Sequence, residues 1–329
     1  MHFRSVIAGP GSRAGALAVA ACLLASGALA GCGLLPGSQA SLAGAGPAAA
    51  ARPTGPPSPT PDRYSPTAPV PCPAATPTGF SCAMRTRIAA VEDFLKTRPG
   101  MIGIVLRDRR SGAVWRNKYA GSQIYMASTS KLAIATTLLA QNQVGVIHLS
   151  SSDRALMYQM LHVSDDNAAD SLWFKYGASF YTSYFPRIGL TTARYLPQQG
   201  VTGAYWGEMT CTPEDLDRLV NYVLGSLPSS VSSYLVYELR HVASVQHFGV
   251  WGAGPANEPG NKDGWSVEKP GWIIDSAGFA APGAQYTLSM MNSLEGDGGY
   301  QDGTDTVTQV AAILFQGHPI AAPTLSATP

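Results

Sequence analysis

The residues best suited to chemistry in this sequence are Ser128 and Lys131, a serine and a lysine three positions apart. A mostly apolar run at 132–139 follows directly, and if this run is helical the two side chains share one face of the helix. A serine hydroxyl becomes an effective nucleophile when a base takes its proton, and a lysine amine can be that base where burial favours its neutral form. The pair indicates acyl transfer through a serine ester, but the same spacing is frequent on solvated helix faces and needs support from further elements.

Two further polar clusters follow this pair in the chain. Ser-Asp-Asp-Asn at 164–167 comes after a helical segment, and Lys-Asp-Gly-Trp at 262–265 comes after a loop rich in glycine and proline. With Ser128 and Lys131, these clusters resemble the three signatures of penicillin-recognising serine hydrolases, and of class A β-lactamases in particular. The resemblance extends from about residue 83 to about residue 317; the first signature matches fully and the other two match in part.

The resemblance implies a role for each matching residue. Ser128 would be the acylated nucleophile, Lys131 its proton acceptor or relay, and Ser164 the group that passes a proton to the leaving group. Lys262 would attract a substrate carboxylate, and Gly264 would let the substrate backbone approach the strand closely. The oxyanion hole would be formed by the N–H of Ser128 and one N–H from the strand after Lys262.

Three departures from the family pattern bear on the substrate. Asp166 stands where the family has an asparagine that donates to the substrate, unless a one-residue insertion makes Asn167 the equivalent, and an ionised carboxylate cannot donate. Asp263 stands where the family has threonine or serine, and it adds negative charge where a β-lactam carboxylate should dock. Class A enzymes activate the deacylating water with a loop glutamate, but the corresponding loop 195–203 has no carboxylate and Glu208 lies too near the next helix. An acyl-enzyme is therefore expected to persist.

The elements that must position these residues are indicated by hydrophobic periodicity. Helices are expected at 83–96, 128–145, 154–162, 231–245 and 304–315, and strands at 101–106, 113–119, 271–279, 285–291 and around Trp265. Thr212, Pro213 and Asp215 mark the start of one more helix. Terminal helices around a mostly antiparallel sheet, with a helical insert, predict an α/β fold of the class A β-lactamase type. The short separation of Ser128 from Ser164 predicts a reduced all-α lobe.

The front of the chain carries an export signal at 1–31, in which basic residues precede the apolar run 16–24. It ends in Leu-Ala-Gly before Cys32, which resembles a bacterial lipobox and predicts lipidation of Cys32; a plain secretory signal is the alternative. A Pro/Ala-rich tether is expected at 32–82, because such a composition buries little apolar surface. The β-lactamase-like domain is expected at 83–318, followed by a tail at 319–329.

Cysteine use and charge limit the remaining possibilities. With Cys22 removed and Cys32 lipidated, Cys72, Cys82 and Cys211 remain, and either Cys72 pairs with Cys82 or one of them pairs with Cys211. No Cys/His spacing suggests a zinc site, so neither a metal nor another cofactor is expected. The formal net charge of +1 over 329 residues gives no field for binding nucleic acid.

These observations predict an exported serine hydrolase, lipid-anchored at the outer face of the cytoplasmic membrane. Its substrate would be a small-molecule or cell-wall-derived acyl or amide compound, with weak or no β-lactam hydrolysis, and the protein would act as a monomer. A non-catalytic binding protein on the same fold is the first alternative. A peptidoglycan D,D-peptidase, which needs no deacylating glutamate of the class A kind, is the second.

Overall fold

The computed structural model describes residues 72–73, 78–197, 200, 203–268 and 271–317. The expected signal, Cys32, most of the tether and the tail lie outside the described residues. Every element described below lies in the second unit of the chain, Thr67–Pro329. Within the described part of the chain, no helix combines the length and apolarity that crossing a bilayer would require.

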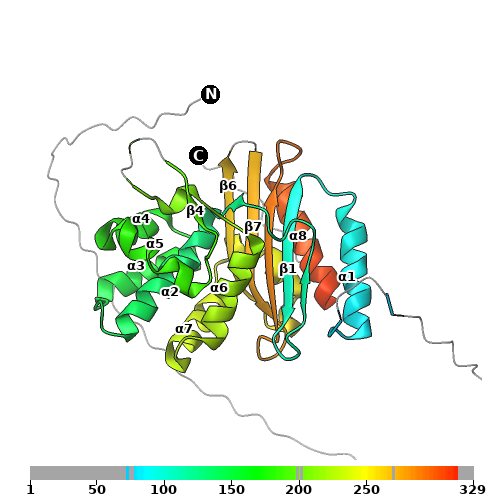
Figure 1. The fold of residues 1–329 in the computed structure, drawn as a ribbon, viewed down its shortest axis with the longest axis horizontal. Coiled ribbons are helices and arrows are strands. Elements are labelled where there is room, and N and C mark those ends of the chain that lie inside the picture. Colours follow the sequence, from blue (N-terminus) through cyan, green and yellow to red (C-terminus); the bar gives the residue numbers. More distant parts are fainter. Residues whose placement is uncertain (1–71, 74–77, 198–199, 201–202, 269–270, 318–329) are drawn as a thin grey trace, which may run out of the picture. The chain divides into compact units, whose positions relative to one another are not determined.

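The centre of the second unit is a five-stranded antiparallel sheet with the strand order β2-β1-β8-β7-β6 (Figure 1). Its strands are β1 (Met101–Asp108), β2 (Val114–Arg116), β6 (Gly260–Glu268), β7 (Gly271–Ala280) and β8 (Tyr286–Ser293). Strand β6 forms one edge and pairs with β7 in a register that joins Lys262 to Ala277 and Asp263 to Ser276. Because side chains alternate between faces and cross-strand partners share a face, this register assigns Lys262 and Asp263 to opposite faces.

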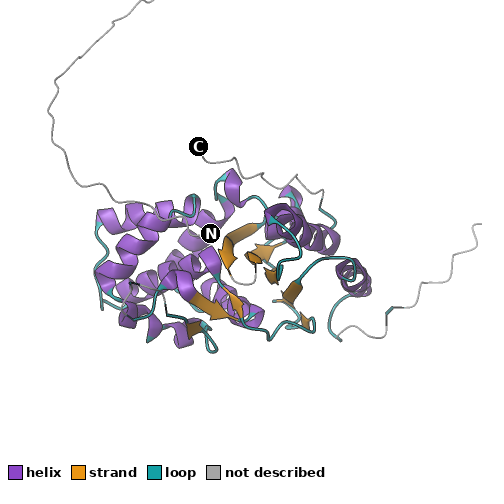
Figure 2. Cartoon of the chain, turned by 90° about the horizontal axis from the view of Figure 1, so that it is seen from above, coloured by secondary structure: helices purple, strands orange, loops and turns teal. Residues whose placement is uncertain are grey.

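The two terminal helices, α1 (Cys82–Leu95) and α8 (Tyr300–Phe315), cover one face of this sheet, as Figure 2 shows from above. Ile88 of α1 and Val307 of α8 belong to one apolar cluster with Ile104, Ile274 and other strand residues. The prediction of helices at both ends of the folded chain is confirmed.

The other face meets a helical lobe whose apolar cluster includes Ile273, Ala277 and Phe279 of β7. Its helices are α2 (Ser130–Gln143), α3 (Ser151–His162), α4 (Asp166–Tyr176), α5 (Ala178–Thr182), α6 (Pro213–Gly225) and α7 (Ser229–Arg240). The start of α6 is as predicted, since the Thr212 hydroxyl accepts from the Asp215 N–H at 3.1 Å and the Asp215 carboxylate accepts from the Thr212 N–H. The predicted α/β architecture with a separate helical lobe is confirmed.

Several local features differ from the expectations. Ser128 lies in a single 3₁₀ turn, η1 (Ala127–Thr129), two residues before α2 begins at Ser130. The strand expected at 113–119 is shortened to β2, because the Asn117 side chain bonds the β1 backbone where strand pairing would continue. A small sheet, β3 (Ile124–Tyr125), β5 (Met209–Cys211) and β4 (Arg194–Tyr195), was not predicted.

Of the two cysteine arrangements left open, the structure has Cys72 bonded to Cys82 and Cys211 free and buried.

Candidate active site

The first signature forms a compact pair at the start of α2. Lys131 Nζ lies 3.0 Å from Ser128 Oγ, so the hydroxyl and the amine share one hydrogen bond. Ser128 is 8% exposed and Lys131 is fully buried, which leaves the nucleophile reachable and its partner screened from water. Ala127, just before the nucleophile, has a φ of 40°, a value that non-glycine residues seldom adopt. Such local strain persists where the surroundings hold it, and it is frequent beside catalytic groups.

Ser164 approaches the same amine from the turn between α3 and α4. Its carbonyl accepts from Lys131 Nζ at 2.5 Å and its hydroxyl at 3.3 Å. The backbone of Ser164 is left-handed, with a φ of 62°, so the second signature contains another strained residue. Asp165, the next residue, caps α4 by accepting from the Ala168 N–H at 2.8 Å.

Lys262 reaches Ser164 from the other side. Its Nζ donates to Ser164 Oγ at 3.0 Å, to the Asp263 carbonyl at 2.7 Å and to the side-chain oxygen of Gln246. Full burial lowers the pKa of Lys262 well below its ordinary value, and the nearby charge of Lys131 lowers it further. Gln246 was not singled out from the sequence, and it provides a neutral acceptor that fixes this buried lysine.

The pKa of Lys131 is also lowered, and burial is the main cause. A hydrogen bond and the charge of Asp166 oppose this effect, with smaller contributions from Asp165 and Asp170. Lys131 Nζ has acceptors at Ser128, at two atoms of Ser164 and at Asp166, whereas an ammonium has three N–H donors. The arrangement suits an amine that exchanges its proton among these neighbours.

Gly264 is where β6 approaches the nucleophile most closely. A Cβ at this position would lie 2.9 Å from the Ser128 amide nitrogen and 3.0 Å from the Met126 carbonyl oxygen. Only glycine permits this contact without moving the strand or the turn. Strand β6 is at the edge of the described sheet, so the backbone groups on its outer side pair with no other strand there. A substrate lying along β6 could bind these groups.

Asp263 is not placed as expected. Its carboxylate lies on the sheet face shared by Ser276, beneath the 3₁₀ segment η5 (Gly249–Ala253), where a Cβ on Gly249 would be 3.4 Å from Asp263 Oδ1. Lys262 bonds the backbone carbonyl of Asp263, and the two side chains form no ion pair in the described structure. Full burial raises the pKa of the Asp263 carboxyl to about 8. The expected repulsion of a substrate carboxylate by Asp263 does not fit this position.

Asp166, by contrast, is at the centre of the site. Its Oδ1 lies 2.5 Å from Lys131 Nζ, and its side chain is 73% exposed while that of Lys131 is fully buried. The residue expected to bind substrate is therefore in direct contact with the amine beside Ser128.

The loop that follows β4 closes the site with an aromatic ring. The Trp206 ring lies over Lys131 Nζ, 4.9 Å from the ring centroid, within the usual range of a cation–π contact. Asp170 fixes this loop, since its Oδ1 accepts from Tyr205 OH at 2.8 Å and from Trp206 Nε1 at 2.7 Å. Asp170 follows Asp166 by four residues on α4, so helical spacing could have identified it. Nothing in the sequence pattern pointed to Trp206.

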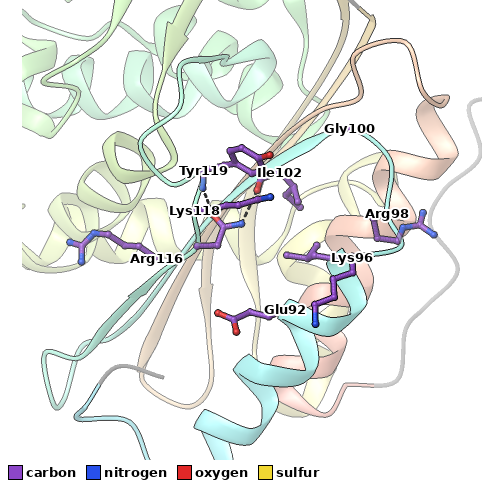
Figure 3. Close-up of a pocket in the computed structure, with 10 residues that line it drawn as sticks. Glu92, Lys96, Arg98, Gly100, Ile102, Arg116, Lys118 and Tyr119 are labelled. Carbon is purple, nitrogen blue, oxygen red and sulfur yellow. Dashed lines mark hydrogen bonds between the residues drawn. The ribbon is translucent and has the colours of Figure 1, made fainter. Parts of the chain in front are cut away.

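A separate cavity of about 510 Å³ lies on the α1 side of the sheet (Figure 3). Most cationic side chains around it already have partners: Lys96 pairs with Asp93, Arg116 pairs with Glu214, and Arg98 donates to Thr306. In Figure 3 the guanidinium groups of Arg116 and Arg98 point away from the cavity. The described residues contain no group of three or more His, Cys, Asp or Glu side chains able to hold a metal ion.

The chain has sequence relatives among known proteins. No family model matches the chain. "Putative lipoprotein LppW" of Mycobacterium tuberculosis and of Mycobacterium bovis is 27% identical over 257 residues, covering 74% of this chain and 78% of that protein.

Solved β-lactamases resemble the structure at low identity. A β-lactamase from Xanthomonas campestris superposes with a TM-score of 0.60 at 16% identity, covering 71% of this chain and 98% of that one. An ancestral class A β-lactamase gives 0.58 at 16% identity, covering 71% and 99%, and a β-lactamase from Desulfarculus baarsii gives 0.55 at 18%, covering 72% and 98%. The chain therefore has the class A β-lactamase fold.

Proposed function

We propose that this protein is a serine hydrolase that works through an acyl-enzyme on Ser128. The observation that carries the proposal is the 3.0 Å contact between Ser128 Oγ and a fully buried Lys131 Nζ whose pKa burial lowers. Lys131 takes the hydroxyl proton, Ser164 passes a proton to the leaving group, and Lys262 attracts an anionic part of the substrate. The substrate is an acyl or amide compound of the cell envelope, and the protein acts as a monomer without a cofactor.

The decisive experiment is the intact mass of the purified protein after incubation with two acyl donors. A fluorescent penicillin probes β-lactam recognition, and p-nitrophenyl acetate probes the nucleophile with a minimal ester. A stable or transient mass increase in the wild type, absent from Ser128→Ala, supports the proposal. Equal labelling of both proteins, or no labelling of either, refutes it.

A non-catalytic binding protein is the second candidate, and the Asp166–Lys131 ion pair favours it. A carboxylate 2.5 Å from Nζ stabilises the ammonium form of Lys131, which cannot accept the serine proton. In this case Asp166→Asn, with the charge removed, is acylated faster than the wild type and the wild type remains unlabelled.

We also propose that the protein is exported and anchored by lipid on Cys32, at the outer face of the membrane. The support is the lipobox-like sequence before Cys32 and the name of the mycobacterial relative. N-terminal mass spectrometry of the mature protein should find a diacylated cysteine at position 32. A mature N-terminus elsewhere, or a Cys32→Ala variant that partitions into detergent like the wild type, contradicts this location.

A further inference from the structure

Asp166 places a carboxylate beside Lys131, although the loop 195–203 contains no acidic residue. Lys131 Nζ lies 3.0 Å from Ser128 Oγ and 2.5 Å from Asp166 Oδ1, so the amine connects the nucleophile to an acid on α4. The two oxygens are therefore no farther apart than 5.5 Å, the sum of these distances. One bridging water spans such a gap, since each hydrogen bond measures about 2.7–3.0 Å. Resting on the proposed acyl-enzyme function, we propose that Asp166 is the base that exchanges protons with Lys131 and activates the deacylating water.

No other acid is placed for this task in the described structure. Asp165 is occupied as the cap of α4, and both donors that Asp170 accepts from belong to the loop. Among the ion pairs of the described residues, the one that includes Lys131 is formed with Asp166. Glu208, the only nearby loop acid, forms no side-chain hydrogen bond or ion pair with Lys131 in the described structure.

The exposure of Asp166 to solvent fits its proposed role in activating the deacylating water. Its side chain is 73% exposed, and Oδ2 forms no hydrogen bond within the described structure, so water can bind there. Oδ1 meanwhile contacts a fully buried amine. A single carboxylate thus reaches both the buried proton relay and the solvent from which the hydrolytic water must come.

These residues account for every proton that is transferred during acylation. Lys131 first gives a proton to Asp166, and the neutral amine then takes the Ser128 proton as the bond from Oγ to the acyl carbon forms. Lys131 returns that proton through Ser164 Oγ to the leaving group as the bond from the acyl carbon to the leaving group breaks. Asp166 then gives its proton back to Lys131, and the ion pair is restored.

Deacylation uses Asp166 and Lys131 again, with Asp166 taking the first proton and Lys131 returning one to Ser128. Asp166 takes a proton from water, and the resulting hydroxide attacks the acyl carbon. When the intermediate collapses, the departing Ser128 Oγ takes a proton from Lys131, and Asp166 reprotonates the amine. The acid product leaves with Ser128 and the ion pair in their starting forms.

Other charged groups that face this pair must be considered in any pH measurement. Lys262 of β6 faces Lys131, Asp165 caps α4, and Asp170 lies on α4 with Asp166. Tyr205 and Glu208 belong to the loop. Burial raises the pKa of Tyr205, and the hydrogen bond to Asp170 and the charges of Asp170 and Asp166 raise it further. A variant that removes a neighbouring charge without touching the pair is therefore the appropriate control.

The test compares Asp166→Asn with Asp165→Asn in the mature protein. Asparagine keeps the helix cap at 165, so this control removes one adjacent negative charge and leaves α4 intact. With nitrocefin and p-nitrophenyl acetate as acyl donors, stopped-flow absorbance and intact mass give the acylation rate and the acyl-enzyme lifetime separately. We expect the Asp166→Asn acyl-enzyme to live about 10²–10⁴ times longer than those of the wild type and the control. We also expect Asp166→Glu to shorten this lifetime again.

A second measurement needs no substrate. The titration of Lys131, followed by NMR of lysine labelled at Cε, should move to lower pH in Asp166→Asn, because the ion pair raises this pKa. The control should move less. Normal acylation with an unchanged acyl-enzyme lifetime in Asp166→Asn, or an unmoved Lys131 titration, overturns the assignment of Asp166. Failure of both donors to acylate the wild type instead refutes the acyl-enzyme function itself, and the relay with it.

Discussion

Gly264 and Ser128 approach so closely that a single added methyl group on the glycine would fall 2.9 Å from the Ser128 amide nitrogen. This nitrogen is one of the two proposed oxyanion donors, so its position decides how well a tetrahedral intermediate is stabilised. The contact joins the edge strand β6 to the turn that carries the nucleophile.

Gly264→Ala should therefore impair acylation more than it impairs folding. Displacing one oxyanion donor typically costs about 10²–10³-fold in rate. The acylation rate with p-nitrophenyl acetate and the thermal midpoint should be measured together. Gly121→Ala is the matched control, since a Cβ there meets no atom within 4 Å. An acylation rate for Gly264→Ala within a few-fold of the control would show that the close approach is not needed.

Two substitutions of Ser164 separate its hydroxyl from its backbone. Glycine adopts the φ of 62° without strain, whereas alanine keeps about the same backbone strain as serine. Both remove the hydroxyl that lies between Lys131 and Lys262. If the hydroxyl relays the leaving-group proton, both variants lose acylation by amide donors to the same extent, by about 10²–10⁴-fold, while Ser164→Gly is the more stable protein. Retained activity in both variants would assign the role to the backbone carbonyl, which both of them keep.

Asp263 should control the pH dependence of stability rather than substrate binding. Its carboxyl has a pKa of about 8 in the folded protein, above the ordinary value of 3.8, because it is fully buried. The folded state then holds more protons than the unfolded state between these values, so this group's stabilisation is complete below pH 4 and is lost as the pH rises through 8. The thermal midpoint of Asp263→Asn should fall less between pH 5 and pH 8 than that of the wild type. Parallel profiles would mean that the carboxyl is not buried in this way.

The placement of Asp263 also shows how far the sequence could predict the site. The motif order correctly predicted that Ser164 and Lys262 converge on the Ser128–Lys131 pair. The strand was expected only around Trp265, although β6 begins at Gly260. Had the strand been extended through 262 and 263, period-two alternation would have sent the two side chains to opposite faces. The error therefore lay in the strand boundary, which sequence patterns define poorly.

Other features carried no signal that sequence reasoning could use. The strands β3 and β4 have two residues each, too few for any periodicity. The contact of Trp206 with Lys131 joins residues 75 positions apart through the folding of a loop. The ion pair of Asp166 with Lys131 likewise depends on how α4 packs against α2, which the residue types alone do not specify.

Asp170 should be the residue that holds the loop over the site. Replacing it with alanine leaves the buried Trp206 Nε1 and the Tyr205 hydroxyl without their acceptor, at a cost of about 1–3 kcal/mol. For a domain of this size each kcal/mol lowers the thermal midpoint by about 2–4 °C. Asp170→Asn keeps one acceptor oxygen and should lose less. Limited proteolysis between β4 and β5 should be faster in Asp170→Ala, and equal proteolysis of all three proteins would mean that other contacts hold the loop.

The last prediction is that the wild type hydrolyses nitrocefin far more slowly than efficient β-lactamases do. In the proposed correspondence with class A β-lactamases, Asp166 stands where those enzymes have an asparagine that donates to the substrate, and an ionised carboxylate cannot donate. A missing partner for a buried substrate carbonyl costs about 1–3 kcal/mol in binding, and this loss falls on acylation. Asp166 also remains bonded to Lys131, so its carboxylate cannot turn toward such a substrate without breaking an ion pair.

Steady-state nitrocefin turnover, with two variants alongside, tests this reasoning. Asp166→Asn restores the donor, so it should show a faster initial burst of about one equivalent and then stall, because the deacylating base is gone. Asp263→Thr introduces a residue that class A β-lactamases have at the matching position, but it should leave turnover unchanged, since the Asp263 carboxylate lies on the sheet face away from Lys262. Efficient turnover by the wild type would show that the missing donor at position 166 does not limit acylation. A rise in turnover for Asp263→Thr would instead show that the charge at 263 reaches the substrate after all.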